Sequence, residues 1–157
     1  MPGACDRQIA VTVGRLDAGA WRAYHGGQCL ALAIALNELT HWPIVWLGRS
    51  SCDGVTVACA DHDDSAVCPC QVGHAGVRTP EGGFLDIDGP RSSVPTERSQ
   101  TSGRASRALV AAILRDPDWP AQDVGAARHF AAALLAELRA GVPADSRAGA
   151  VSAWAER

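Results

Sequence analysis

Cys29 lies where a glycine-containing segment meets the start of an apolar helical segment. Gly26 and Gly27 come shortly before it, and residues 30–36 (LALAIAL) have high helix propensity and no polar side chain. The first N–H groups of a helix have no acceptor within the helix, and their partial positive charge favours a thiolate over a thiol. The N–H of Cys29 would point towards an oxyanion on an attacked carbonyl group, and Gly27 leaves room for a substrate backbone. The sequence therefore predicts a nucleophilic sulfur at Cys29.

A thiol nucleophile needs a general base, and the base needs a group that orients it. His74 lies in the first of two predicted strands, and Asp86 and Asp88 lie in the second. Because side chains alternate along a strand, the five-residue turn 79–83 (TPEGG) favours a hairpin with His74 and both aspartates on one face. A two-residue turn would instead put His74 opposite aliphatic side chains. The spacing leaves open which aspartate orients His74.

Two other histidines flank the helical segment. His25 lies four residues before Cys29 and His41 follows the segment, so each is an alternative base, and His25 is the better placed. His129 is expected on the polar side of a later helix, in contact with solvent.

The remaining cysteines offer a second kind of chemistry. Cys59, His62, Cys68 and Cys70 supply four soft ligands within twelve residues, a set that could hold zinc tetrahedrally. Cys52 is left outside this set. The alternatives are unpaired thiols, or disulfides if the protein is exported. No other cofactor is expected.

A scaffold must position these residues, and the pattern predicts a single α+β domain over 1–157 with an antiparallel sheet. Its core spans 20–90, and two C-terminal helices follow. The predicted elements are a loop over 21–29, a buried helix over 30–39, strands over 44–47, 55–59, 72–78 and 84–88, a mobile loop over 89–104, helices within 105–141 and a frayed tail over 144–157. Pro43 ends the first helix, and Pro117 and Gly141 mark the ends of the last two.

Composition narrows the classes of function. The chain has 157 residues, of which 47% are apolar and 20% are charged, and its net charge is −3. This balance argues against a basic nucleic-acid-binding face and against a polybasic membrane anchor. All 14 basic residues are arginine, so no lysine is present for Schiff-base chemistry. The longest apolar run is too short to span a membrane and the N-terminus lacks a signal-peptide pattern, so we expect a cytoplasmic protein.

Four short strings carry a resemblance to a known enzyme superfamily. They are Gly27-Gln28-Cys29 before the aliphatic helix, Trp42-Pro43-Ile44 after it, His74 ahead of a glycine-containing turn, and Phe84-Leu85-Asp86 after that turn. In this order, over residues 24–89, they resemble the papain-like and transglutaminase-like thiol enzymes. The resemblance implies a papain-like core, in which a buried N-terminal helix packs on a small antiparallel sheet.

The same resemblance implies an activity. Enzymes of this superfamily hydrolyse or transfer acyl groups through a thioester, which implies Cys29 as nucleophile, His74 as general base and acid, and Asp86 as its orienting group. The implied substrate is a peptide or protein amide, and the reaction is hydrolysis, deamidation or transglutamination. The glutamine that papain-type enzymes place several residues before the cysteine is absent, so Gln28 or Tyr24 would have to replace it as oxyanion donor. The alternatives are a non-catalytic binding module of this fold and a small zinc-stabilised interaction domain.

Overall fold

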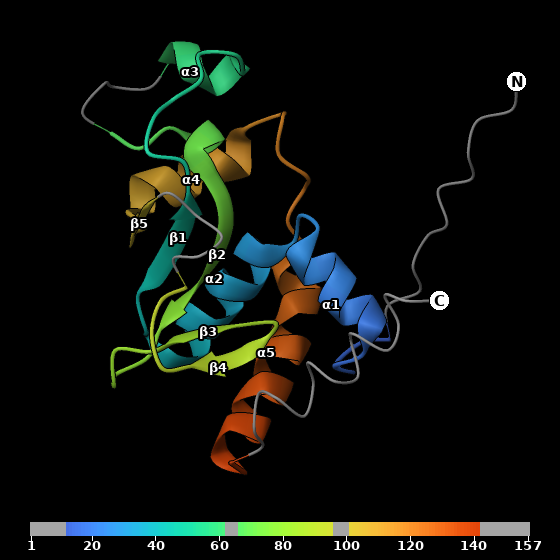
Figure 1. The fold of residues 1–157 in the computed structure, drawn as a ribbon. Helices are drawn as coiled ribbons and strands as arrows, with labels where there is room; N and C mark the ends of the chain where they lie inside the picture. Colours follow the sequence, from blue (N-terminus) through green and yellow to red (C-terminus); the bar gives the residue numbers. More distant parts are fainter. Residues whose placement is uncertain (1–11, 62–65, 96–100, 142–157) are drawn as a thin grey trace, which may run out of the picture.

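A computed structural model describes residues 12–61, 66–95 and 101–141, and within these ranges the fold is α+β (Figure 1). Its helices are α1 (Ala18–His25), α2 (Cys29–Thr40), α3 (Val57–Asp61), the 3-10 turn η1 (Pro69–Gln71), α4 (Arg107–Arg115) and α5 (Val124–Arg139). Its strands are β1 (Ile44–Gly48), β2 (Val72–Arg78), β3 (Phe84–Asp86), β4 (Gly89–Arg91) and β5 (Thr101–Arg104). They form one antiparallel sheet in the order β4-β3-β2-β1-β5.

The helix α2 is the centre of the core. It contacts both β2 and α5, and seven of its twelve residues are buried, from Cys29 to Leu36. This burial on every side follows from its sequence, because the alanine and leucine side chains leave no polar face until Asn37. The first residue of α2 is therefore held by a rigid element.

The main sequence-based predictions of the fold are confirmed. The structure contains the helix predicted over 30–39, the strand over 44–47, the hairpin of β2 and β3, and both C-terminal helices. The hairpin pairs Val77 with Leu85 and Arg78 with Phe84, so five residues form its turn. None of the described helices is both long enough and apolar enough to cross a lipid bilayer.

Two local predictions before the hairpin are wrong. The loop predicted over 21–29 is largely the helix α1, which begins because the Asp17 carboxylate accepts hydrogen bonds from the N–H groups of Gly19 and Ala20. The strand predicted over 55–59 is absent, and residues 57–59 instead begin the helix α3. Its β-branched residues are largely exposed, so they have no sheet to pack on.

The mobile loop predicted over 89–104 is also wrong at both ends. Residues 89–91 form β4 and residues 101–104 form β5, each at one edge of the sheet. Backbone pairing with β3 and β1 outweighs the low strand propensity of these glycine-, proline- and serine-containing segments. The predicted tail over 144–157, His62 and Cys5 lie outside the described residues.

Candidate active site

Cys29 is the first residue of α2, directly after a tight turn from α1. Gly26 ends α1, and Gly27 has a φ of 138°, a conformation that favours glycine. A Cβ atom on Gly27 would lie 2.9 Å from Cγ of Pro120, so the turn packs closely against the connection between α4 and α5. The Cys29 side chain is buried, with 3% of the residue exposed.

A glutamine from a distant part of the chain caps this end of α2. Oε1 of Gln122 accepts a hydrogen bond of 2.9 Å from the N–H of Ala31, and its Nε2 donates to the carbonyl oxygen of Gly27 at 2.6 Å. The N–H of Cys29 belongs to the same first turn, where amides have no acceptor within the helix. Sequence reasoning missed Gln122, because no local pattern links it to a helix that begins 93 residues earlier.

His74 on β2 and Asp86 at the end of β3 form a close pair. His74 Nε2 lies 2.7 Å from Oδ2 of Asp86, and Asp86 is only 2% exposed. The other carboxylate oxygen, Oδ1, accepts a hydrogen bond from the N–H of Asp88. The structure thus brings together His74 and Asp86 across the hairpin, as the five-residue turn predicts.

The His74 ring also interacts with the thiol of Cys29. Burial lowers the pKa of His74, but the hydrogen bond with Asp86 and the interaction with the Cys29 thiol outweigh burial and raise this pKa to about 9. The imidazole is therefore protonated at neutral pH. Nε2 is hydrogen-bonded to Asp86, so Nδ1 is the ring nitrogen left for a hydrogen bond with the Cys29 sulfur.

A second histidine–aspartate pair lies beside the first. His25 Nε2 lies 2.9 Å from Oδ1 of Asp88, and its ring stacks on that of His74 with centroids 5.2 Å apart. Asp88 also accepts hydrogen bonds from Trp21 and Arg91, each at 2.7 Å. Burial raises the pKa of Asp88, but its bonds with His25, Trp21 and Arg91 together hold it well below its usual range. His25, the alternative base from sequence, is thus engaged by its own aspartate.

Three further residues considered from sequence have other partners in the structure. The Gln28 side chain donates to the carbonyl of Ala121 and accepts from the N–H of Asp123, so it is committed to the start of α5. Tyr24 is buried, and its ring contacts Phe130. His41 caps the opposite end of α2. Both the oxygen and the nitrogen of the Gln28 amide, one of the two oxyanion donors considered from sequence, thus have partners next to the start of α5.

Within the part of the chain that the structure describes, two groups of side chains have atoms close enough to share a metal ion. One group is His25, Asp86 and Asp88. The carboxylate oxygens of both aspartates, however, already accept hydrogen bonds from other side chains. The second group is Cys52, Cys59, Cys68 and Cys70. This group contains three of the four ligands considered from sequence, together with Cys52, which sequence reasoning left out.

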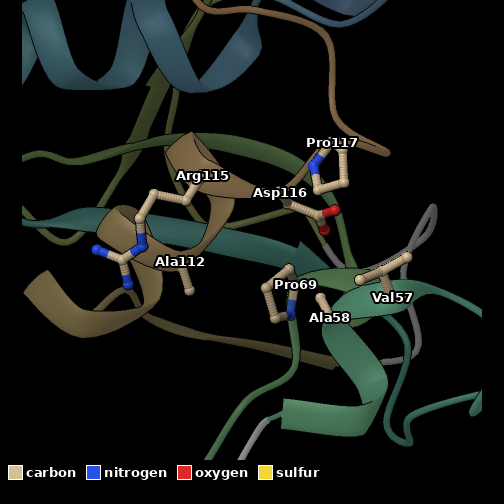
Figure 2. Close-up of a pocket in the computed structure, with 7 residues that line it drawn as sticks. All are labelled: Val57, Ala58, Pro69, Ala112, Arg115, Asp116 and Pro117. Carbon is tan, nitrogen blue, oxygen red and sulfur yellow. The ribbon is translucent and has the colours of Figure 1, made fainter.

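A shallow pocket opens elsewhere, between α3, η1 and α4 (Figure 2). Val57 and Pro69 line one side, and Arg115 and Asp116 line the other. It contains none of the Cys29, His74 and Asp86 side chains, so it is no substrate pocket for a reaction at the Cys29 sulfur.

Comparison with known proteins finds no matching family model, no matching curated protein and no matching solved structure. The grounds for inferring a function are therefore the geometry of Cys29, His74 and Asp86 and the short sequence strings that contain them.

Proposed function

We propose that this protein is a cysteine-dependent acyl-transfer enzyme that acts through a thioester on Cys29. The observation that carries this proposal is the position of the His74 ring. One side of the ring is fixed at 2.7 Å from the buried carboxylate of Asp86, and the ring also interacts with the Cys29 thiol. Covalent catalysis by sulfur requires a nucleophile, a base and a group that orients the base.

The reaction would begin from the Cys29 thiolate and the His74 imidazolium. The sulfur attacks the carbonyl carbon of an amide, and the Cys29 N–H stabilises the resulting oxyanion. His74 gives its proton to the leaving nitrogen as the carbon–nitrogen bond breaks, which leaves a thioester on Cys29. Water or an amine then attacks the thioester and gives a proton to His74, and the carbon–sulfur bond breaks to restore the thiolate.

Asp86 would keep His74 oriented and protonated in the resting enzyme. Its carboxylate holds Nε2, so that Nδ1 faces the sulfur throughout the cycle. Hydrolysis, deamidation and transfer to an amine share this first half-reaction and differ only in the leaving group and the acceptor. The papain-like and transglutaminase-like resemblance supports a peptide or protein amide as substrate.

A non-catalytic binding module is the second candidate, and one observation favours it. Only 3% of Cys29 is exposed, so a bulky substrate has no open path to the sulfur in this conformation. A small acyl group can approach the sulfur more easily than a bulky substrate, because 18% of the neighbouring His74 side chain is exposed. The test must therefore use a small reagent.

Acylation by p-nitrophenyl acetate, followed by peptide mass spectrometry, separates the two candidates. The enzyme proposal expects acetyl thioester on Cys29 in the native protein, none at this position in Cys29→Ala, and much slower formation in His74→Ala. His129→Ala is the matched control, since His129 is an exposed histidine on α5. A Cys29 that reacts only after unfolding would support the non-catalytic module instead.

A further inference from the structure

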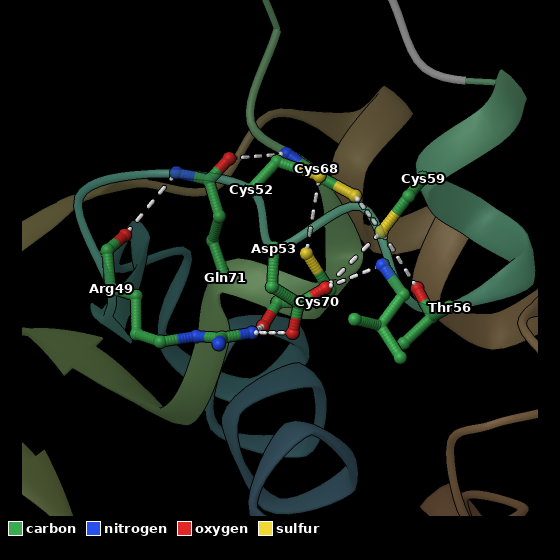
Figure 3. Close-up of polar contacts among 9 residues, drawn as sticks. Arg49, Cys52, Asp53, Thr56, Cys59, Cys68, Cys70 and Gln71 are labelled. Carbon is green, nitrogen blue, oxygen red and sulfur yellow. Dashed lines mark hydrogen bonds and ion pairs between the residues drawn. The ribbon is translucent and has the colours of Figure 1, made fainter.

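Four cysteines converge in the connection between β1 and β2, away from the candidate active site. Cys52 follows β1, Cys59 lies in α3, and Cys68 and Cys70 lie at η1 (Figure 3). Their four Sγ atoms all lie within 4.8 Å of one another. This connection occupies the end of the molecule that Figure 1 shows at the top, around α3.

Two of the sulfur–sulfur distances are close to those of a tetrahedral metal site. Four sulfurs at about 2.3 Å from one zinc ion are about 3.8 Å from each other. Sγ of Cys68 lies 3.8 Å from Sγ of Cys59, and Sγ of Cys70 lies 3.5 Å from Sγ of Cys52. A disulfide would need about 2.05 Å, which is far shorter than either distance.

We propose that Cys52, Cys59, Cys68 and Cys70 bind one zinc ion as a closed structural site. Thiolates are soft ligands that suit zinc, and four protein ligands complete its tetrahedral shell. No position is left for water or substrate, so this site organises the chain and does not catalyse. The proposal does not depend on the proposed function of Cys29.

Polar contacts surround the four cysteines and hold this part of the chain together. The guanidinium of Arg49 donates to Oδ2 of Asp53 at 2.6 Å and to the carbonyl oxygen of Cys70 at 2.8 Å. The hydroxyl of Thr56 lies 3.1 Å from Sγ of Cys59. Four thiolates and one zinc ion carry a net charge of −2. Arg49 lies beside them as a cation, paired with Asp53, and Oδ1 of Asp53 lies 3.6 Å from Sγ of Cys59. Partners of this kind orient metal ligands and hold their charge.

The site also connects to β2. The amide oxygen of Gln71 accepts from the N–H of Cys68 at 2.8 Å, and the carbonyl oxygen of Gln71 accepts from the N–H of Arg49 at 2.8 Å. Zinc would thus tie the end of β1 to η1, the turn that leads directly into β2. Loss of zinc should loosen residues 49–61 and 66–71 more than α2.

Metal analysis of the full-length reduced protein tests the proposal. After equilibration with zinc chloride and desalting, we expect about one zinc per chain, and none in Cys52→Ser or Cys70→Ser. Cys29→Ser is the matched control and should keep its zinc. Cobalt(II) added to the metal-free wild type should give the intense visible bands of a tetrahedral tetrathiolate complex, a readout that does not depend on the variants folding.

Three results would overturn this assignment. The first is reduced wild-type protein that retains no zinc and gives no such cobalt spectrum. The second is zinc that stays at full stoichiometry in Cys52→Ser and Cys70→Ser. The third is protein that holds Cys52–Cys70 and Cys59–Cys68 disulfides and, once reduced, binds neither metal. None of these results would change the acylation expected at Cys29, so the two proposals fail separately.

Discussion

Replacing Asp86 by asparagine should sharply lower the pKa of His74. The amide keeps the shape of the carboxylate but removes the charge that lies 2.7 Å from Nε2. In the wild type this bond and the Cys29 thiol outweigh burial and raise the pKa of His74 from 6.5 to about 9. In Asp86→Asn, burial opposes the thiol alone, and the pKa should return towards or below 6.5.

The shift corresponds to a contribution to stability with a defined pH range. One pKa unit is worth about 1.36 kcal/mol, so a rise from 6.5 to about 9 corresponds to roughly 3 kcal/mol in favour of the folded state. Because the folded pKa is the higher one, this contribution is fully present below pH 6.5 and is lost as the pH rises through about 9. The wild type should lose stability over this range, and Asp86→Asn should lose much less.

Two measurements check this prediction. Nuclear magnetic resonance of histidine labelled with carbon-13 gives the pKa of His74 directly, with His74→Gln used to assign the signal. Urea unfolding at several pH values between 6 and 9.5 gives the change in stability, and Cys29→Ser separates the contribution of the thiol. A wild-type His74 that titrates near 6.5, or a His74 pKa that Asp86→Asn leaves unchanged, would show that the Asp86 carboxylate does not raise this pKa.

Two further substitutions test how the scaffold holds the site. A Cβ on Gly76 would lie 2.7 Å from the carbonyl oxygen of Leu85, so Gly76→Ala should lower the free energy of unfolding by about 1–3 kcal/mol in urea titrations. Gly73→Ala on the same strand is its control, since its nearest contact is 3.7 Å away, and equal losses in both variants would contradict the close packing. Gln122→Ala removes the acceptor of the Ala31 N–H and should cost about 1 kcal/mol; an unchanged urea midpoint would show that this cap contributes nothing.

The elements with strong local patterns could be predicted from sequence. The helix that follows Cys29 is apolar on all sides, and the TPEGG turn between two apolar segments indicates a hairpin. These two elements suffice to bring His74 near Asp86, because alternation along strands fixes which residues share a face. The sequence could not choose between Asp86 and Asp88, since both share the same parity in the strand predicted over 84–88. In the structure this strand ends at Asp86, and Asp88 lies in the turn that follows.

The features that could not be predicted depend on contacts between distant segments. Nothing near β5 in the sequence indicates that its backbone would pair with β1, and no local rule assigns Gln122 to the start of α2. Cys52 lies outside any short metal-binding spacing, yet in the structure its sulfur lies 3.5 Å from that of Cys70. One missed element did have a local signal, because Asp17 is a favourable N-cap for α1.

The most direct test of the proposed chemistry is the dependence of Cys29 acylation on His74. The rate constant for acetyl transfer from p-nitrophenyl acetate to Cys29, followed by peptide mass spectrometry, should fall by at least about 100-fold in His74→Ala. It should stay at the wild-type value in His129→Ala. Two results would contradict the proposal that Cys29 is a nucleophile assisted by His74. One is equal rates of Cys29 acylation with and without the His74 imidazole, and the other is no acylation of native Cys29.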